Sequence, residues 1–323
     1  MNHFLHASTR KCCAIILLIG CTYFTSFGQY SERTSFWEAG LTVGPSNFLG
    51  DLGGHYGKGK PFLKDNNIQM TKLTYGVHLS YHPSEFIAVR ISGNFGILEG
   101  DDAIIKGKGS YEESRRARNS DFRSKFQEVF VVAEFYPGVF FEYEPEDVYH
   151  KMRPYGLIGL GVFHFNPMGT DPLTGNWVAL KPLRTEGQGF AEFPDRKEYK
   201  LIQMNLPVGA GMKYYITERS NLSLEVIHRF TTTDYIDDVS TRYIDPNLFY
   251  QYRPQYYTTQ TADLAARMSN KSGTTGTRFA PGKKRGTAEN RDGYYSVGFK
   301  FSTRIGADAS TRFTNSTRCP IRF

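Results

Sequence analysis

The sequence predicts an all-β chain that folds as an eight-stranded antiparallel transmembrane barrel of the outer-membrane type, with long extracellular loops. Three observations predict it. Eight segments alternate apolar residues with small or polar ones, and long and short gaps alternate between these segments. After the first thirty residues no apolar run approaches the roughly 18 residues that a spanning helix needs. The mean hydropathy of −0.44 is therefore compatible with a membrane barrel whose loops and lumen are polar.

Residues 1–28 have the layout of a secretory signal peptide. A basic start, Arg10-Lys11, precedes an apolar stretch over residues 12–21 and a small-residue exit at 26–28. We expect the mature chain to begin at Gln29. The alternative is a lipoprotein cleavage site at residues 18–21, with Cys21 carrying the lipid. In both cases the protein leaves the cytoplasm.

Cysteine usage leaves no internal disulfide in the expected mature chain. Three of the four cysteines lie in the leader, so Cys319 stands alone near the C-terminus. An exported chain without disulfides must gain its stability elsewhere, and a sheet closed on itself in a membrane would provide it.

In the first half of the chain the alternation predicts four strands. Residues 37–43 place apolar side chains at odd positions and polar or small ones at even positions, and residues 73–81 and 87–95 repeat this pattern. Residues 128–135 follow it less cleanly, because apolar residues also stand at even positions. Each segment has one apolar face.

In the second half four more strands are predicted. Residues 153–165 carry three glycines among their aromatic residues, and there the facing is ambiguous. Residues 202–215, 222–230 and 295–302 alternate with few exceptions. Segments of about ten residues are long enough for tilted strands to cross a bilayer. Aromatic residues at several strand ends fit the girdles that lie at membrane interfaces.

The gaps between predicted strands favour a membrane barrel over a soluble one of the lipocalin type. Long and short gaps alternate, as they do between extracellular loops and periplasmic turns. The longest, residues 231–293, is more than a soluble eight-stranded barrel usually carries. An even strand number places both termini of the chain in the periplasm. The predicted organisation is a leader over residues 1–28, a barrel over residues 29–304 and a tail over residues 305–323.

The inward face of the predicted barrel carries nearly balanced charges. An unpaired charge in a narrow lumen would be costly, so we expect ion pairs there. Eight strands leave room only for side chains, which makes a diffusion pore improbable and structural pairing preferable to a proton or ion path. The predicted polar network of the lumen consists of Glu38, Arg90, Glu134, Lys213, Glu225, Arg229 and Lys300.

No motif in the sequence carries a strong signal for catalysis. His228 precedes Asp234, Asp237 and Asp238, but an acid–base site needs hydrogen-bond geometry that spacing cannot show, and His228 falls on the lipid-facing side. The three aspartates lack the spacing of a known calcium loop. We therefore expect no enzyme activity, no metal and no cofactor. The net charge of +7 is too scattered to predict binding to nucleic acid.

Two long loops are basic, and their cations suit phosphate groups of lipopolysaccharide. A solvated charged loop is the equally acceptable alternative. The residues are Arg115, Arg116, Arg118 and Arg123 in one loop and Lys283, Lys284, Arg285 and Arg291 in the other.

Three stretches resemble a family of outer-membrane barrels, the PorG type, associated with the type IX secretion and gliding machinery of Bacteroidota. They are residues 29–52, with Asp51 near the end, residues 233–243, and the last strand at 293–301. The second stretch, Thr-Asp-Tyr-Ile-Asp-Asp-Val-Ser-Thr-Arg-Tyr, is the most specific and contains Asp234, Asp237 and Asp238.

The resemblance implies a non-enzymatic accessory subunit that ties the periplasmic ring of the secretion machine to the outer membrane. The docking surface would then be the periplasmic turn at 140–151 and the tail after Arg304, and the aspartate motif would organise a loop at the outer rim. Within that turn the implied contacts are Tyr143, Glu144, Glu146 and Asp147. The chain departs from the family in its long loop at 253–292 and in its tail. The alternative function is an independent small barrel that acts as a lipid-modifying surface enzyme or a narrow solute channel.

Overall fold

The computed structural model describes residues 35–52, 68–105, 109–141, 151–217, 219–275 and 278–305. The predicted leader at 1–28, with the Cys21 alternative, and the tail beyond residue 305 lie outside these ranges. The domain boundaries therefore stay predictions. The part from Phe36 onward forms one compact unit and is described by itself.

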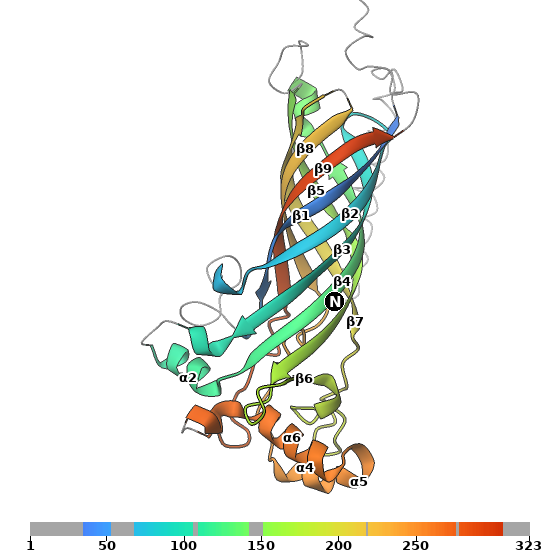
Figure 1. Cartoon of the computed structure of the whole chain (residues 1–323). Helices are drawn as coiled ribbons and strands as arrows, with labels where there is room; N and C mark the ends of the chain where they lie inside the picture. The colour runs from blue at the N-terminus through green and yellow to red at the C-terminus, as the bar shows by residue number, and fades with distance from the viewer. Residues whose placement is uncertain are drawn as a thin grey trace, which may run out of the picture. The chain divides into compact units, whose positions relative to one another are not determined.

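A single antiparallel sheet closes into a barrel of eight strands (Figure 1). Each of the eight strands pairs with the next one along the chain, including β4 with β5. Pairing of β1 with β9 closes the ring. The short β6 pairs only with the end of β5 and takes no part in closure. The predicted eight-stranded antiparallel barrel is confirmed. The strands are β1 (Phe36–Leu49), β2 (Lys72–His82), β3 (Ile87–Asp101), β4 (Asp121–Phe135), β5 (Met152–Thr170), β6 (Trp177–Ala179), β7 (Ile202–Tyr215), β8 (Ser220–Thr231) and β9 (Gly293–Ile305).

The two ends of the barrel differ in their connections. The first residues of β1 lie opposite the last of β9, with Trp37 paired to Ile305, so both strands have their outer termini at one end. This end also has the connections at 83–86, 136–151 and 216–219. The opposite end has the connections at 50–71, 102–120, 171–201 and 232–292. These two ends are called here the terminal end and the loop end.

The exterior of the barrel is apolar around all eight strands. Exposed aliphatic and aromatic side chains alternate with buried polar ones, the inverse of a soluble barrel, and this is what a lipid-facing wall requires. The chain is thus a small transmembrane β-barrel of the outer-membrane type. The outward residues include Leu41, Val77, Ile91, Val131, Leu160, Leu206, Leu224 and Phe299.

Short helices gather at the loop end, in the lower part of Figure 1. Three of them, with part of the 171–201 connection, bury an apolar cluster around Phe190, Phe249 and Met268. None of the helices in the described part is both long and apolar enough to span a membrane. The α-helices are α2 (Ser110–Arg118), α4 (Asn247–Gln251), α5 (Arg253–Tyr256) and α6 (Thr259–Ser269), and the 3-10 turns are η3 (Ile68–Met70), η4 (Asp102–Ile104), η5 (Pro137–Phe141), η6 (Lys181–Leu183) and η7 (Lys271–Thr275).

Candidate functional site

The centre of the lumen holds a four-membered charge network. Arg90 Nε lies 2.9 Å from Glu134 Oε1, and Arg90 Nη1 lies 3.0 Å from Glu225 Oε2. Lys300 Nζ lies 3.4 Å from Glu225 Oε2 and 3.6 Å from Glu134 Oε1. Two cations thus neutralise two carboxylates inside the wall, which is the condition for burying charge at tolerable cost.

Further ion pairs lie on either side of this network. Toward the terminal end, Glu38 accepts a hydrogen bond of 2.9 Å from Lys213 Nζ and lies 3.3 Å from His82 Nε2. Toward the loop end, Arg229 Nε donates to Glu128 Oε1 over 3.1 Å. The lumen is therefore filled along its length by paired side chains.

All seven residues of the predicted lumen network point inward and are at most 4% exposed. The alternation along the strands was sufficient to predict that these side chains face the lumen. Several uncharged or weakly basic partners were not among the predicted site residues. One of them, Tyr155, lies in the segment whose facing was ambiguous, and its hydroxyl donates to Glu225 Oε2 over 2.9 Å. The other partners not predicted are His82, Tyr136, Asn205 and Tyr294.

The loop end of the lumen is closed by the chain segment that follows β8. Ile236 and Val239 are fully buried in an apolar cluster with side chains from the strands. We call residues 234–239 the mouth plug. The strand residues that surround it include Phe48, Leu98, Phe122, Phe126, Phe165 and Tyr294.

Two aspartates fix the backbone of the mouth plug. Asp237 accepts hydrogen bonds from the backbone N–H of Leu52 over 3.0 Å and of Val239 over 2.9 Å. Asp292, next to β9, accepts one from Ile236 N–H over 2.8 Å. The plug is therefore tied to the segments that follow β1 and precede β9.

Asp51 joins the same junction from the end of β1. Its Oδ2 atom accepts from Thr287 N–H over 2.5 Å. Gly286 packs against it so closely that a Cβ would lie 2.7 Å from both Asp51 Oδ2 and Ser240 N. Only glycine permits this approach.

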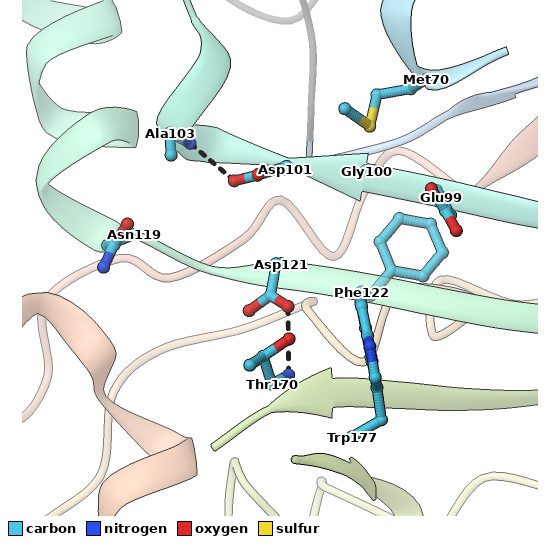
Figure 2. Close-up of a pocket in the computed structure, with 10 residues that line it drawn as sticks. All are labelled: Met70, Glu99, Gly100, Asp101, Ala103, Asn119, Asp121, Phe122, Thr170 and Trp177. Carbon is cyan, nitrogen blue, oxygen red and sulfur yellow. Dashed lines mark hydrogen bonds between the residues drawn. The ribbon is translucent and has the colours of Figure 1, made fainter. Parts of the chain in front are cut away.

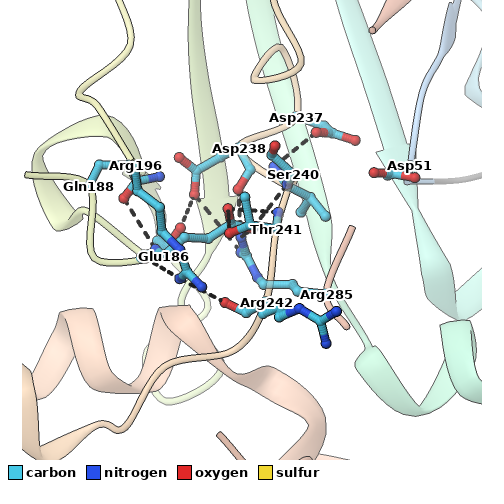
Figure 3. Close-up of polar contacts among 12 residues, drawn as sticks. Asp51, Glu186, Gln188, Arg196, Asp237, Asp238, Ser240, Thr241, Arg242 and Arg285 are labelled. Carbon is cyan, nitrogen blue, oxygen red and sulfur yellow. Dashed lines mark hydrogen bonds and ion pairs between the residues drawn. The ribbon is translucent and has the colours of Figure 1, made fainter. Parts of the chain in front are cut away.

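A second set of contacts holds Asp238, in the plug, and Ser240 and Thr241, which follow it (Figure 3). Asp238 has a left-handed backbone with φ 61°, and its carboxylate accepts from Thr185 and, over 2.7 Å, from Tyr199. Glu186 accepts from the backbone N–H groups of Ser240 over 2.9 Å and of Thr241 over 2.9 Å.

One arginine connects the two carboxylates of this set. Arg285 Nη1 lies 2.8 Å from Glu186 Oε1 and also donates to the Asp238 carbonyl. The connection before β7 and the connection before β9 are thereby joined to the plug. Glu186 and Asp292, which hold the plug, were not among the predicted site residues, and no motif or spacing in the sequence marks them.

Within the described ranges, no salt bridge reaches the carboxylates of Asp234, Asp237 and Asp292, which lie in or beside the plug. Burial, and then the neighbouring Asp237 carboxylate, raises the pKa of Asp234 to about 9. Burial raises the pKa of Asp237 well above its ordinary value, with Asp51 adding to the effect. Burial followed by Asp237 and Asp234 does the same to the pKa of Asp292. Burial and mutual repulsion therefore raise the pKa of all three carboxyl groups.

Asp238 has an intermediate behaviour. Burial raises its pKa to about 6, while the Arg285 guanidinium opposes that rise. Among the described residues, no three or more His, Cys, Asp or Glu side chains are placed to hold a metal ion.

Two of the basic loop residues predicted to meet lipopolysaccharide phosphates are not accessible. Arg118 is buried and forms a bidentate contact with Asp102, at 2.6 and 2.8 Å. It also donates to the Asp51 carbonyl over 2.6 Å. Arg285 is buried against Glu186. For these two the prediction is wrong, because folding uses the guanidinium groups to join loops.

Other sequence-derived candidates fall on different parts of the molecule. His228 is half-buried on the outward face of β8, with its ring against Phe230. Asp234 is buried beside Asp237. The implied periplasmic contacts Tyr143, Glu144, Glu146 and Asp147 lie outside the described residues, as does the tail.

Comparison with known proteins finds one family model and several solved structures. Residues 15–171 match the Domain of unknown function DUF6089. No curated protein matches the chain. Among solved structures, the attachment invasion locus protein Ail of Yersinia pestis is 8% identical, covering 84% of this chain and 99% of its own, with a TM-score of 0.34.

Two further solved structures are similar to the same extent. Neisserial surface protein A is 7% identical over 84% of this chain and 97% of its own, with a TM-score of 0.33. The outer membrane protein OprG of Pseudomonas aeruginosa is 10% identical over 83% and 94%, with a TM-score of 0.29. Identities and TM-scores this low carry no argument about function.

Proposed function

We propose that this protein is a non-catalytic barrel of the bacterial outer membrane that acts through its surfaces, as an anchor or assembly subunit. The observation that carries the proposal is the filled lumen. Paired charges occupy its length, and the mouth plug closes the loop end. A sealed barrel offers its partners a rigid fixed point in the membrane and no path for solutes.

The finer proposal is that the protein serves the type IX secretion machinery by contacting its periplasmic ring. It rests on the PorG-type resemblance stated above. In support, the three stretches that carry this resemblance meet in one place: Asp51 follows β1, Asp237 lies in the mouth plug, and the last strand begins beside Asp292. They belong to one structural unit, the closure of the loop end.

The proposed docking surface is the turn at 140–151 with the tail after Arg304, which in this proposal face the periplasm. The test is affinity purification of the tagged full-length chain from solubilised envelopes. We expect ring proteins to co-purify, and substitution of Tyr143, Glu144, Glu146 and Asp147 by alanine to release them. A matched control substitutes the exposed Asp195 and Lys197 at the loop end, which should change nothing.

Two outcomes would defeat this proposal. One is recovery of the barrel without ring proteins from envelopes in which the ring is intact. The other is a gene deletion that leaves secretion of large cargo proteins and gliding unaffected.

The alternatives, a narrow channel or a lipid-modifying enzyme, have separate tests. Conductance in planar bilayers above that of empty membranes would favour the channel, against the filled lumen. Lipid turnover that is lost in both His228→Ala and Asp234→Asn would favour the enzyme. The proposal expects neither.

A further inference from the structure

The barrel wall continues beyond its apolar band at the loop end. On β3 the outward apolar residues Phe95 and Ile97 are followed by the outward residues Glu99 and Asp101, and on β4 Asp121 and Arg123 take the corresponding positions. On β3 these polar residues lie two to four residues past Ile97, roughly 7–13 Å along the strand. The outer wall here faces the layer above the hydrocarbon rather than the lipid tails.

A cavity of about 340 Å³ opens on this polar wall. It is bounded by the ends of β3 and β5, the start of β4 and the short β6 (Figure 2). Its size falls within the range of small-molecule sites, toward the lower end. The lining includes Glu99, Asp101, Asp121, Phe122, Thr170 and Trp177.

Two of the three carboxylates in the lining are fully engaged. Glu99 lies 2.8 Å from Lys72 Nζ and 2.5 Å from Arg123 Nε. Asp121 pairs with Lys271 and accepts from the backbone N–H of Thr170 over 3.0 Å. Both carboxylates thus already have partners on each oxygen, cations for Glu99 and a cation and a backbone N–H for Asp121.

Asp101 is the carboxylate that remains. Its Oδ1 atom accepts from Ala103 N–H over 2.8 Å, and in the described part of the chain it forms no ion pair. It lies directly opposite Asp121 across the β3–β4 ladder. Like charges in that position destabilise a sheet. Asp101 caps η4 through its hydrogen bond with Ala103 N–H, and its carboxylate also lines the cavity, where the second oxygen has no hydrogen-bond partner among the described residues.

Trp177 supplies the aromatic part of the cavity wall. Arg123 lies 4.5 Å from its ring centroid, and the side chain is 37% exposed. The arginine fixes the indole while leaving part of it open. An indole held in this way offers a ligand a flat apolar surface with little loss of conformational entropy.

The charges around the cavity define the ligand. Three carboxylates are matched by three cations, Lys72, Arg123 and Lys271, so no net charge selects an ion. A carboxylate only accepts hydrogen bonds, so the ligand must donate them, and the indole favours an apolar face. Sugars combine hydroxyl donors with an apolar C–H face.

We propose that this cavity binds a sugar residue, whose hydroxyl groups donate to Asp101 and whose apolar face packs on Trp177. The sugar has two possible sources: a saccharide linked to lipid in the surrounding leaflet, or a free oligosaccharide. The inference rests on the geometry of the wall and is independent of any role in secretion.

The two tryptophans of the chain make a direct test possible, since only Trp177 lines the cavity and Trp37 lies near the terminal end. A Trp37→Phe variant of the full chain in phospholipid nanodiscs reports on the cavity by fluorescence. Two probes separate the sources: core oligosaccharide released from the host's lipopolysaccharide, and intact lipopolysaccharide incorporated into the disc. We expect a saturable change in Trp177 emission with at least one of them.

Asp101→Asn is the sharpest variant, because asparagine retains an oxygen for the Ala103 N–H and so preserves the local turn. We expect it to weaken binding by about tenfold or more, since it removes hydrogen bonds to a charged acceptor. Asp195→Asn, at an exposed position, is the matched control and should bind normally. Trp177→Phe, followed by calorimetry, should also bind more weakly.

Three results would overturn the proposal. The first is the absence of a saturable signal with both probes. The second is unchanged affinity in the Asp101→Asn variant. The third is tighter binding of a lysine-rich peptide than of either saccharide, which would assign the cavity to a cationic partner.

Discussion

Buried carboxylates are stabilised in opposite ways at the centre of the lumen and at its mouth. At the centre, Glu134 and Glu225 both contact Arg90 and Lys300. At the mouth, Asp237 and Asp292 accept from backbone N–H groups and lie near one another. At the centre, cations neutralise the carboxylates. At the mouth, the pKa values of the carboxyl groups are raised, which favours their protonated form.

This difference separates the roles of the two regions. Ion pairs in a dry lumen hold distant strands in register and respond weakly to pH. A junction of carboxyl groups that joins loops is sensitive to pH, because ionisation sets like charges against one another. The barrel wall should therefore be the constant part of the molecule and the mouth plug the adjustable part.

The largest expected effect comes from breaking the central network. Arg90→Met leaves Glu134 and Glu225 facing Lys300 alone, and removal of one partner from a buried ion network costs roughly 3–5 kcal/mol. Urea unfolding in lipid vesicles, followed by gel mobility of the folded barrel, measures it. Arg219→Met, in an exposed turn, is the control and should stay within about 0.5 kcal/mol of the parent. Equal effects of the two changes would contradict the structural role of the network.

Shortening the apolar side chain of the plug should have the next largest effect. Ile236 is fully buried, so Ile236→Ala loses roughly 2–5 kcal/mol of packing. We expect the loss to appear as faster amide exchange over residues 234–239, with the barrel strands unchanged. Leu173→Ala, at an exposed loop position, serves as the control. A uniform loss of protection over all strands would show that plug and wall unfold together.

Raising the pH by a single unit should have a smaller effect, about 1.4 kcal/mol. The pKa of Asp234 is raised to about 9, so the folded mouth binds this proton more tightly than the unfolded chain does. Its contribution to stability is full below the ordinary pKa of about 4 and is lost as the pH rises through about 9. Plug opening, corrected for intrinsic exchange, should increase by up to about tenfold per pH unit between roughly pH 5 and 8 and should level off as the pH passes about 9.

Asp234→Asn should flatten that pH dependence, since an amide cannot ionise. Asp263→Asn, which changes an exposed carboxylate bonded to Tyr250, should leave it intact. If the parent, the Asp234→Asn variant and the Asp263→Asn variant had the same pH profile, groups other than Asp234 would control the opening of the plug.

The smallest effect concerns the helices at the loop end. Thr258 caps α6 in a reciprocal pair of hydrogen bonds with Thr261. Thr258→Ala should cost about 1 kcal/mol and increase amide exchange in α6 alone. Gln260→Ala, an exposed change inside the same helix, is the comparison and should have little effect. If Thr258→Ala also increased amide exchange in the mouth plug, α6 and the plug would be coupled.

Some predictions from the sequence and the structure differ for identifiable reasons. The strands β3, β4 and β5 extend further toward the loop end than the alternation indicated, because their outward residues become polar once they leave the apolar band. Arg118 and Arg285 were predicted to be accessible, because charge in a loop usually faces solvent. Their burial depends on carboxylates from distant segments.

The sequence by itself determined the strand number, the antiparallel order, the inward face of the seven predicted lumen residues and the position of the long connections. It could do so because lipid outside and close packing inside act on each residue separately, and this imprints a period of two on every strand. Only the tertiary structure decided which charges pair, that residues 234–239 close the mouth, and that Glu186 and Asp292 take part. Those contacts join loops far apart in the chain, and no local pattern records which loops meet.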